Sequence, residues 1–145
     1  MFRGRFEHTI DTKGRTSIPS KFREVLATNY DERLIMTNFD GCIWAYPAAE
    51  WQIIESKVAA LPQFKEEVKA LQRVFISAAT ECPIDKQGRI IIPPTLRDYA
   101  ALDKEIILVG MTKRIEIWSR NRWQTEFEKS QAQVASNKGL ADLGL

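Results

Sequence analysis

The sequence is poor in the residues that bind metals and carry out nucleophilic catalysis. Its 145 residues include one histidine, His8, and two cysteines, Cys42 and Cys82. A structural zinc site needs about four ligands, and these three residues do not have the spacing of such a site. The sequence also shows no nucleophile–histidine pairing, no carboxylate pair and no glycine-rich phosphate loop. We therefore expect no enzyme, no cofactor, no metal and no small-molecule substrate.

Long apolar segments are missing as well. No apolar run approaches the roughly 20 residues that cross a bilayer, and the first residues, MFRGRFE, lack the apolar core of a secretory signal. Both cysteines have apolar neighbours, which favours buried free thiols in a reducing cytosol over a single disulfide. We expect a cytoplasmic protein that has no membrane partner.

The formal net charge of +2 is small, but the positive charge is unevenly placed. The first 23 residues contain six basic side chains against two acidic ones. Such a basic end indicates either an anionic partner that contacts one face or an ordinary solvated surface. Charge alone does not decide between these two interpretations.

One motif occurs twice. The pattern Ile-Asp-x-x-Gly-Arg-x-x-Ile-Pro-x-x-x-Arg begins at Ile10 and returns, 74 positions later, at Ile84. The match continues to Trp51 and Trp123, with two residues lost on the way. Internal repeats indicate that one structural unit is used twice. The predicted divisions are a first repeat at 5–51, a helical connector at 52–79, a second repeat at 80–123, and a C-terminal helix and tail at 124–145.

Each repeat reads as short strands with one small helix. In the first repeat, alternation predicts strands at 6–10, 15–18, 34–37 and 42–46, with a turn at 11–14 and a helix after Pro19. The second repeat matches this pattern. A unit of about 45 residues is too small to be stable alone, so strands of the two units should pack together. We predict a mainly β fold with helices (α+β), namely an interleaved β-barrel with pseudo-twofold symmetry.

Helical spacing is confined to the connector and the C-terminal segment. In the connector, apolar residues spaced by three and four predict a helical hairpin that is broken at Pro62. The predicted seam consists of Trp51, Ile54, Val58, Leu61, Phe64, Val68, Leu71 and Phe75. A further helix is expected to begin near Trp123 and Phe127. These helices either cover the barrel or contact neighbouring protomers.

The repeated turn contains the residues that we expect to bind DNA. Asp11 can fix the turn, Gly14 allows it, and Lys13 and Arg15 project from it. Arginine can bind guanine O6 and N7, and lysine can bind phosphate. Alternatively, Asp11 and Arg15 only brace the turn, and one guanidinium can do both. Because Gln87 replaces the lysine in the second copy, we expect the first loop to contact DNA directly and the second to be more structural.

Several motifs together resemble the MraZ family of bacterial regulators, which have two tandem SpoVT-AbrB-type domains. They are the initial MFRG, the two Asp-x-x-Gly-Arg loops, the YPxxxW segment that ends at Trp51, and the stretch from Trp118 to Trp123. The resemblance covers roughly residues 1–127. It implies a swapped-hairpin β-barrel, a ring-shaped homo-oligomer and specific binding to short direct repeats in double-stranded promoter DNA. It further implies control of the gene cluster for division and cell-wall synthesis, including the protein's own gene.

The resulting prediction is a DNA-binding transcriptional repressor that is associated with the nucleoid. The predicted DNA-binding residues are Arg3, Arg5, Lys13, Gly14, Arg15 and Arg89, and the predicted structural residues are Asp11, Asp85 and Gly88. Arg3 and Arg5 are expected to contact phosphates. The alternative is an antitoxin-like or structural interaction protein with the same barrel fold.

Overall fold

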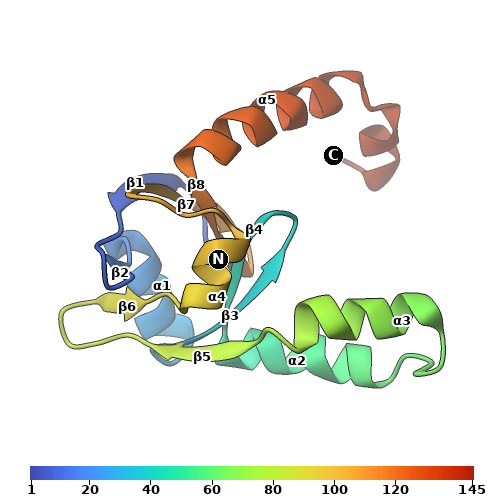
Figure 1. Cartoon of the computed structure of the whole chain (residues 1–145). Helices are drawn as coiled ribbons and strands as arrows, with labels where there is room; N and C mark the ends of the chain where they lie inside the picture. Colours follow the sequence, from blue (N-terminus) through green and yellow to red (C-terminus); the bar gives the residue numbers. More distant parts are fainter.

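Six strands pair into one antiparallel sheet, and two short strands form a second one (Figure 1). The computed structural model describes residues 1–145, apart from the side chain of Lys138. The six strands follow one another in space as β1 (Arg5–Thr9), β7 (Glu105–Met111), β8 (Arg114–Ser119), β4 (Cys42–Pro47), β3 (Arg33–Phe39) and β5 (Thr80–Pro83). The second sheet, called the ribbon below, consists of β2 (Arg15–Ser17) and β6 (Arg89–Ile91).

The strand order follows the sequence repeat. Strands β1, β3 and β4 of the first copy correspond to β5, β7 and β8 of the second. Read from one edge, the order is β1, β7, β8, and read from the other edge it is β5, β3, β4, which are the corresponding strands. At the centre, β4 pairs with β8, and Trp44 lies opposite Glu116. Each edge strand pairs with the other copy, β1 with β7 and β5 with β3. The two copies therefore share one sheet, as expected of units that are too small to fold alone.

The strands do not close into the predicted barrel. Within the described residues, β1 and β5 are the free edges of the large sheet, and the ribbon pairs only within itself. The two three-residue strands of the ribbon form their backbone hydrogen bonds with each other. The ribbon is therefore joined to the large sheet only by local contacts. One of them runs from Thr16 Oγ1, which donates to the carbonyl oxygen of Thr9 at 2.9 Å. The α+β class is confirmed, closure of the barrel by backbone pairing is wrong, and the swapped-hairpin connection stays a prediction.

The main hydrophobic core lies between the sheet, the ribbon and two helices, α1 (Ser20–Asn29) and α4 (Pro94–Tyr99). Phe22 and Leu26 of α1 and Leu96 of α4 are almost completely buried. Phe2 joins this core with its ring 5.6 Å from that of Phe22, while its backbone pairs with Thr112. The two cysteines are buried free thiols, as predicted. Burial raises the pKa of both thiols, that of Cys82 to about 11.

The predicted helical hairpin is present on the other face of the sheet. It consists of α2 (Ala48–Ala59), α3 (Glu66–Leu71) and the π-helical segment η1 (Gln72–Ile76). Tyr46 of β4, Trp51 of α2 and Phe75 of η1 form the aromatic cluster that fixes the hairpin to the sheet. The hairpin and the ribbon lie at opposite sides of the molecule (Figure 1).

The apolar seam of this hairpin is shorter than predicted. Leu61 and Phe64 lie between the helices and are 41% and 92% exposed. Helix α2 ends at Ala59, and the Gln63 side-chain amide donates to the carbonyl oxygens of Val58, Ala59 and Leu61. Because this amide satisfies carbonyls that the helix leaves free, the helix stops before the apolar spacing does.

The C-terminal helix α5 (Arg120–Ser136) begins three residues before Trp123, because the Ser119 hydroxyl caps it by accepting the N–H of Arg122. A 3-10 helix, η2 (Lys138–Leu143), follows. No residue of α5 is buried, and the helix extends away from the sheet (Figure 1). Over the described residues, the helices lack the combination of length and apolar character that crossing a membrane requires.

Candidate nucleic-acid interface

The first repeated loop is a tight turn closed by its own backbone. The N–H of Gly14 donates to the Asp11 carbonyl oxygen, and the N–H of Asp11 donates to that of Arg15, both at 3.0 Å. The carboxylate oxygen Oδ1 of Asp11 then accepts the N–H groups of Lys13 and Arg15 at 2.9 Å. An aspartate that bonds the backbone ahead of it in this way fixes the turn.

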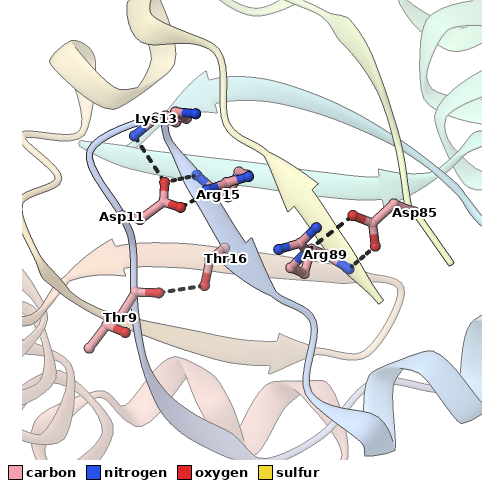
Figure 2. Close-up of polar contacts among 7 residues, drawn as sticks. All are labelled: Thr9, Asp11, Lys13, Arg15, Thr16, Asp85 and Arg89. Carbon is pink, nitrogen blue, oxygen red and sulfur yellow. Dashed lines mark hydrogen bonds and ion pairs between the residues drawn. The ribbon is translucent and has the colours of Figure 1, made fainter. Parts of the chain in front are cut away.

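The second loop repeats this geometry. The Oδ1 atom of Asp85 accepts the N–H groups of Gln87 and Arg89 at 2.9 Å, and the N–H of Gly88 donates to the Asp85 carbonyl oxygen. Figure 2 shows the two Asp–Arg pairs, with Arg15 and Arg89 on the two strands of the ribbon and each aspartate on the chain that precedes its strand. Both copies therefore build the same turn, although only the first contains Lys13.

Each aspartate also orients the arginine of its own loop. Arg15 Nε donates to Asp11 Oδ2 at 2.8 Å, and Arg89 Nε donates to Asp85 Oδ2 at 3.2 Å. These arginine side chains are 38% and 41% exposed. Among the described residues, their Nη1 and Nη2 atoms have no hydrogen-bond partner. The aspartate thus braces the turn through the Nε atom of its arginine. The two amino groups of each guanidinium stay available to a ligand.

The same bonds change the acidity of the aspartates. The backbone N–H and then the side chain of Arg15 lower the pKa of Asp11 to about 2. The backbone N–H of Arg89 lowers the pKa of Asp85. Hydrogen bonds to the ionised carboxylate favour that form. Both loops therefore keep their negative aspartates and oriented arginines at neutral pH.

The ribbon places both arginines on one exposed face. In the strand register, Arg15 lies opposite Ile91 and Ser17 lies opposite Arg89. Thr16 and the residue opposite it, Ile90, point to the other side and are buried. Side chains directly opposite each other in an antiparallel pair share a face. This face, called the ribbon face below, carries Arg15, Ser17, Arg89 and Ile91.

Each turn glycine is bound to the other copy. The carbonyl oxygen of Gly14 accepts the N–H of Ile92 at 2.8 Å, and that of Gly88 accepts the N–H of Ile18 at 2.9 Å. A Cβ atom on Gly14 would lie 2.9 Å from the Ile92 carbonyl oxygen and 2.8 Å from Arg97 Cζ. A Cβ atom on Gly88 would clash in the same way with the guanidinium of Arg23.

These contacts explain the spacing of the repeated motif. The isoleucine of the Ile-Pro pair and the arginine four residues after the proline do not contact the turn of their own copy. They contact the turn of the other copy. In the sequence, Arg23 and Arg97 are only the last identity of the motif. In the structure, each lies against a turn glycine whose φ angle is positive, +85° at Gly14 and +76° at Gly88. A side chain at either glycine would be strained and would have to displace the guanidinium group.

The structure brings together most of the predicted site but separates two residues from it. Lys13, Gly14, Arg15 and Arg89 lie in or beside the ribbon, as do the structural Asp11, Asp85 and Gly88. Arg5 lies at the start of β1, four residues and roughly 13 Å along the strand from Thr9. Its guanidinium carbon is 4.4 Å from the centre of the Phe127 ring and 5.9 Å from that of Trp123. Arg3 precedes it, with its backbone against Gly110.

Lys86 is the cation that the sequence-based reasoning missed. It is exposed in the second loop and aligns with Thr12, one position before the residue that aligns with Lys13. Each loop therefore has one lysine, one arginine and one aspartate. A comparison of whole loops, rather than of the aligned position of Lys13, would have found it.

The described residues hold no cluster of three or more His, Cys, Asp or Glu side chains that could bind a metal ion. The exposed groups at the ribbon are instead arginine and lysine donors. Such a surface binds anions, and the paired arginine amino groups suit planar acceptors.

Replacing Gly14 by alanine should lower the free energy of unfolding more than replacing Gly41. Gly41 has a similar φ angle of +77°, but a Cβ there would only meet Arg122 Nη1 at 3.7 Å. Gly41→Ala should thus cost only the left-handed conformation, about 1–2 kcal/mol. Gly14→Ala adds the clash with Ile92 and Arg97. Urea unfolding of both variants measures the difference, and equal losses would contradict the packing role of Gly14.

The carboxyl group of Asp11 should titrate near pH 2 in the folded protein, against 3.8 for an ordinary aspartate. Because the folded-state pKa is the lower one, the carboxylate stabilises the fold fully above about pH 4, and this contribution is lost as the pH falls towards 2. Carbon-13 NMR of the aspartate carboxyl groups measures the midpoint. In Arg15→Ala the midpoint should rise but stay below 3.8, since the backbone N–H groups remain. A midpoint of 3.8 in the unmodified protein would exclude the proposed hydrogen bonds.

Two comparisons with known proteins, one with family models and one with single relatives, agree on one family. The model of the family described as "MraZ protein, putative antitoxin-like" matches residues 1–74 and again residues 75–142. A protein of Pediococcus pentosaceus named Transcriptional regulator MraZ is 44% identical over the full length of both chains. Proteins of the same name from Desulfitobacterium hafniense and Ligilactobacillus salivarius are 45% and 46% identical, the first over all of both chains and the second over 94% of this chain and 96% of its own. These relatives are named as regulators, in agreement with the prediction that the chain is not an enzyme. Two family matches in tandem and relatives of this similarity along the whole chain show that the protein belongs to the MraZ family.

Proposed function

We propose that the protein is a transcriptional regulator that binds DNA in a sequence-specific manner through the ribbon. One observation carries the proposal. Arg15 and Arg89 lie on one exposed face, and each is held at Nε by an aspartate of its own loop, so that Nη1 and Nη2 are left for a ligand. The names of the relatives support a role in transcription.

The ribbon suits the major groove in shape. This groove is about 12 Å wide and admits a two-stranded β-ribbon. Along the ribbon, Arg15 and Arg89 are two residue positions apart, which is about 7 Å at 3.3 Å per residue. Two base-pair steps of 3.4 Å span nearly the same distance. The two arginines would therefore contact bases about two steps apart, and guanine, with its O6 and N7 acceptors, is the base that we propose.

The loop lysines supply the contacts that do not depend on sequence. Lys13 and Lys86 are exposed at the turns, at opposite ends of the ribbon, and we propose that both bind phosphates. This extends the DNA contact to both loops, whereas the sequence had favoured the first. Arg5 has no part in the proposal because its charge lies over the rings of Trp123 and Phe127. Arg3 comes just before this end of β1, away from the ribbon, and is left out because of this position.

The resemblance to the family supplies the finer parts of the proposal. We propose that the target is promoter DNA with short direct repeats upstream of the division and cell-wall gene cluster, which includes the protein's own gene. We further propose that binding represses these genes, and that the protein acts in the cytoplasm at the nucleoid. The repeat divisions at 5–51 and 80–123 and the swapped-hairpin connection between the two units belong to the same proposal.

We also propose a ring-shaped homo-oligomer. One ribbon makes few base contacts, and a single weak site per chain would be insufficient for a regulator. In a ring, the binding of one ribbon raises the effective concentration of its neighbours at the next repeat. Repeats spaced by one helical turn would present the same groove to successive ribbons.

Arg15→Ala and Arg89→Ala should each weaken DNA binding about 5- to 150-fold, because a bidentate arginine–guanine contact contributes about 1–3 kcal/mol of discrimination. The measurement is fluorescence anisotropy with a duplex from the region upstream of the protein's own gene, at physiological salt. Lys13→Ala and Lys86→Ala should each lower the salt dependence by about one phosphate contact. Unchanged binding by Arg15→Ala would refute the ribbon mechanism.

Arg73→Ala is the matched control for lost charge. Arg73 is an exposed arginine of η1, in the connector. Its replacement should leave the affinity close to that of the unmodified protein. Gln87→Ala should also have little effect. If Arg73→Ala were as damaging as Arg15→Ala, the loss would reflect net charge and not the ribbon.

The ring should be visible in multi-angle light scattering at micromolar concentration as a mass several times the 16.6 kDa of one chain. Its disruption should weaken binding to a duplex with several repeats much more than binding to a duplex with one. A monomer under these conditions would remove the avidity argument and leave DNA binding by single chains in place.

A further inference from the structure

Ile91 is exposed where its neighbours are not. The side chains before and after it, Ile90 and Ile92, are 1% and 0% exposed and belong to the core, whereas Ile91 is 59% exposed. It lies on the ribbon face directly opposite Arg15. An apolar side chain among arginines, on the surface that we assign to DNA, is not explained by the packing of the protein.

The same position in the first repeat is filled in a different way. Ser17 corresponds to Ile91 and lies opposite Arg89. Its hydroxyl is 3.1 Å from His8 Nδ1, and its carbonyl oxygen is 2.8 Å from the same nitrogen. The two arginines of the ribbon face therefore have unlike neighbours, one apolar and one polar. Among the four side chains of the ribbon face, the pseudo-twofold symmetry is therefore broken at the pair Ser17 and Ile91.

We propose that Ile91 is a specificity-determining residue, which contacts the 5-methyl group of a thymine beside the base bound by Arg15. The proposal rests on the proposed function, because it requires the ribbon face to enter the major groove. Thymine is the only base that presents a methyl group there, and apolar side chains are the groups that contact it.

The geometry favours this contact. Side chains directly opposite in an antiparallel pair have Cβ atoms about 5 Å apart, so Ile91 and Arg15 reach the same or adjacent base pairs. Isoleucine is branched at Cβ and has few rotamers, which holds its methyl groups in one direction. Ile91 also borders a hollow that is lined by Pro83, Ile84 and Pro93 as well as by Glu81, Asp85 and Arg89, so that further apolar carbon adjoins one side of its exposed surface.

The charge of the surface argues for DNA rather than another apolar partner. Arg15 lies directly opposite Ile91, Arg89 lies two residues before it on the same strand, and the two loop lysines lie at the ends of the ribbon. An apolar protein surface would leave these cations without partners. The edge of a base pair in the major groove offers acceptors for the arginines and a methyl group for the isoleucine, while phosphates on either side offer anions for the lysines.

The test replaces thymine by deoxyuridine, which removes only the methyl group. The probe is the duplex of highest affinity selected by the unmodified protein from a random pool, with each thymine replaced in turn. At one position, the replacement should weaken binding about three- to fivefold, as expected for one buried methyl group. Ile91→Ala should bind the original duplex with a similar loss and should not distinguish thymine from uracil at that position.

Ile53→Ala is the matched control. Ile53 is on α2 and is 50% exposed, so an isoleucine of similar exposure is removed away from the ribbon. This variant should keep both the affinity and the preference for thymine. Because Ile91 is exposed, Ile91→Ala should keep the unfolding temperature, which is checked by circular dichroism.

Three results would overturn the proposal. First, the unmodified protein could bind equally well whichever thymine is replaced by uracil. Second, Ile91→Ala could keep both the affinity and the full preference for thymine. Third, Ile91→Ala could bind more weakly and still keep that preference, which would indicate a different apolar partner for Ile91. If Arg15→Ala still lost affinity in these cases, the proposed function would stand without the role of Ile91. If no duplex were selected, or if Arg15→Ala bound normally, both proposals would fall.

Discussion

The hydrogen bond that the carbonyl oxygen of each turn glycine accepts from the opposite copy is the contact on which the ribbon depends. Gly14 accepts from Ile92, and Gly88 accepts from Ile18, so each turn is fixed in place by the other repeat. Arg97 and Arg23 lie against the two glycines, so that a side chain at either one would displace a guanidinium group. A change in one copy is therefore transmitted to the loop of the other, and the two exposed arginines are positioned by the whole fold.

The aspartates add local order to this long-range constraint. An arginine side chain loses considerable conformational entropy when it binds a ligand. In both loops, part of this side-chain entropy is already lost when the protein folds, since Nε is bound to Asp11 or Asp85 before any ligand arrives. Preorganisation of this kind favours binding without adding any contact. It also explains why the same Asp–Arg pair can both brace the turn and present a donor surface.

The sequence predicted the local elements well because they depend on neighbouring residues. The alternation around β1, the Asp-x-x-Gly turns and the proline before α1 all lie where expected. Contacts between distant segments were harder to predict. Nothing near Arg5 indicates that its charge lies over Phe127, more than a hundred residues later. In the same way, the apolar spacing continues through Leu61 and Phe64, past the end of α2, which stops before Pro62 with its last carbonyl oxygens bonded by the Gln63 amide.

A ribbon built from one chain has two ends that can differ. In a symmetric dimer of identical subunits, every substitution on one strand appears on the other, and the surface looks the same from both directions. Here Ile91 beside Arg15 has no counterpart beside Arg89, where Ser17 lies. Joining the two copies in one chain thus gives the surface a polarity. A DNA site recognised by it would have a forward and a reverse orientation, and identical subunits that face the DNA in the same direction would require sites that all point the same way.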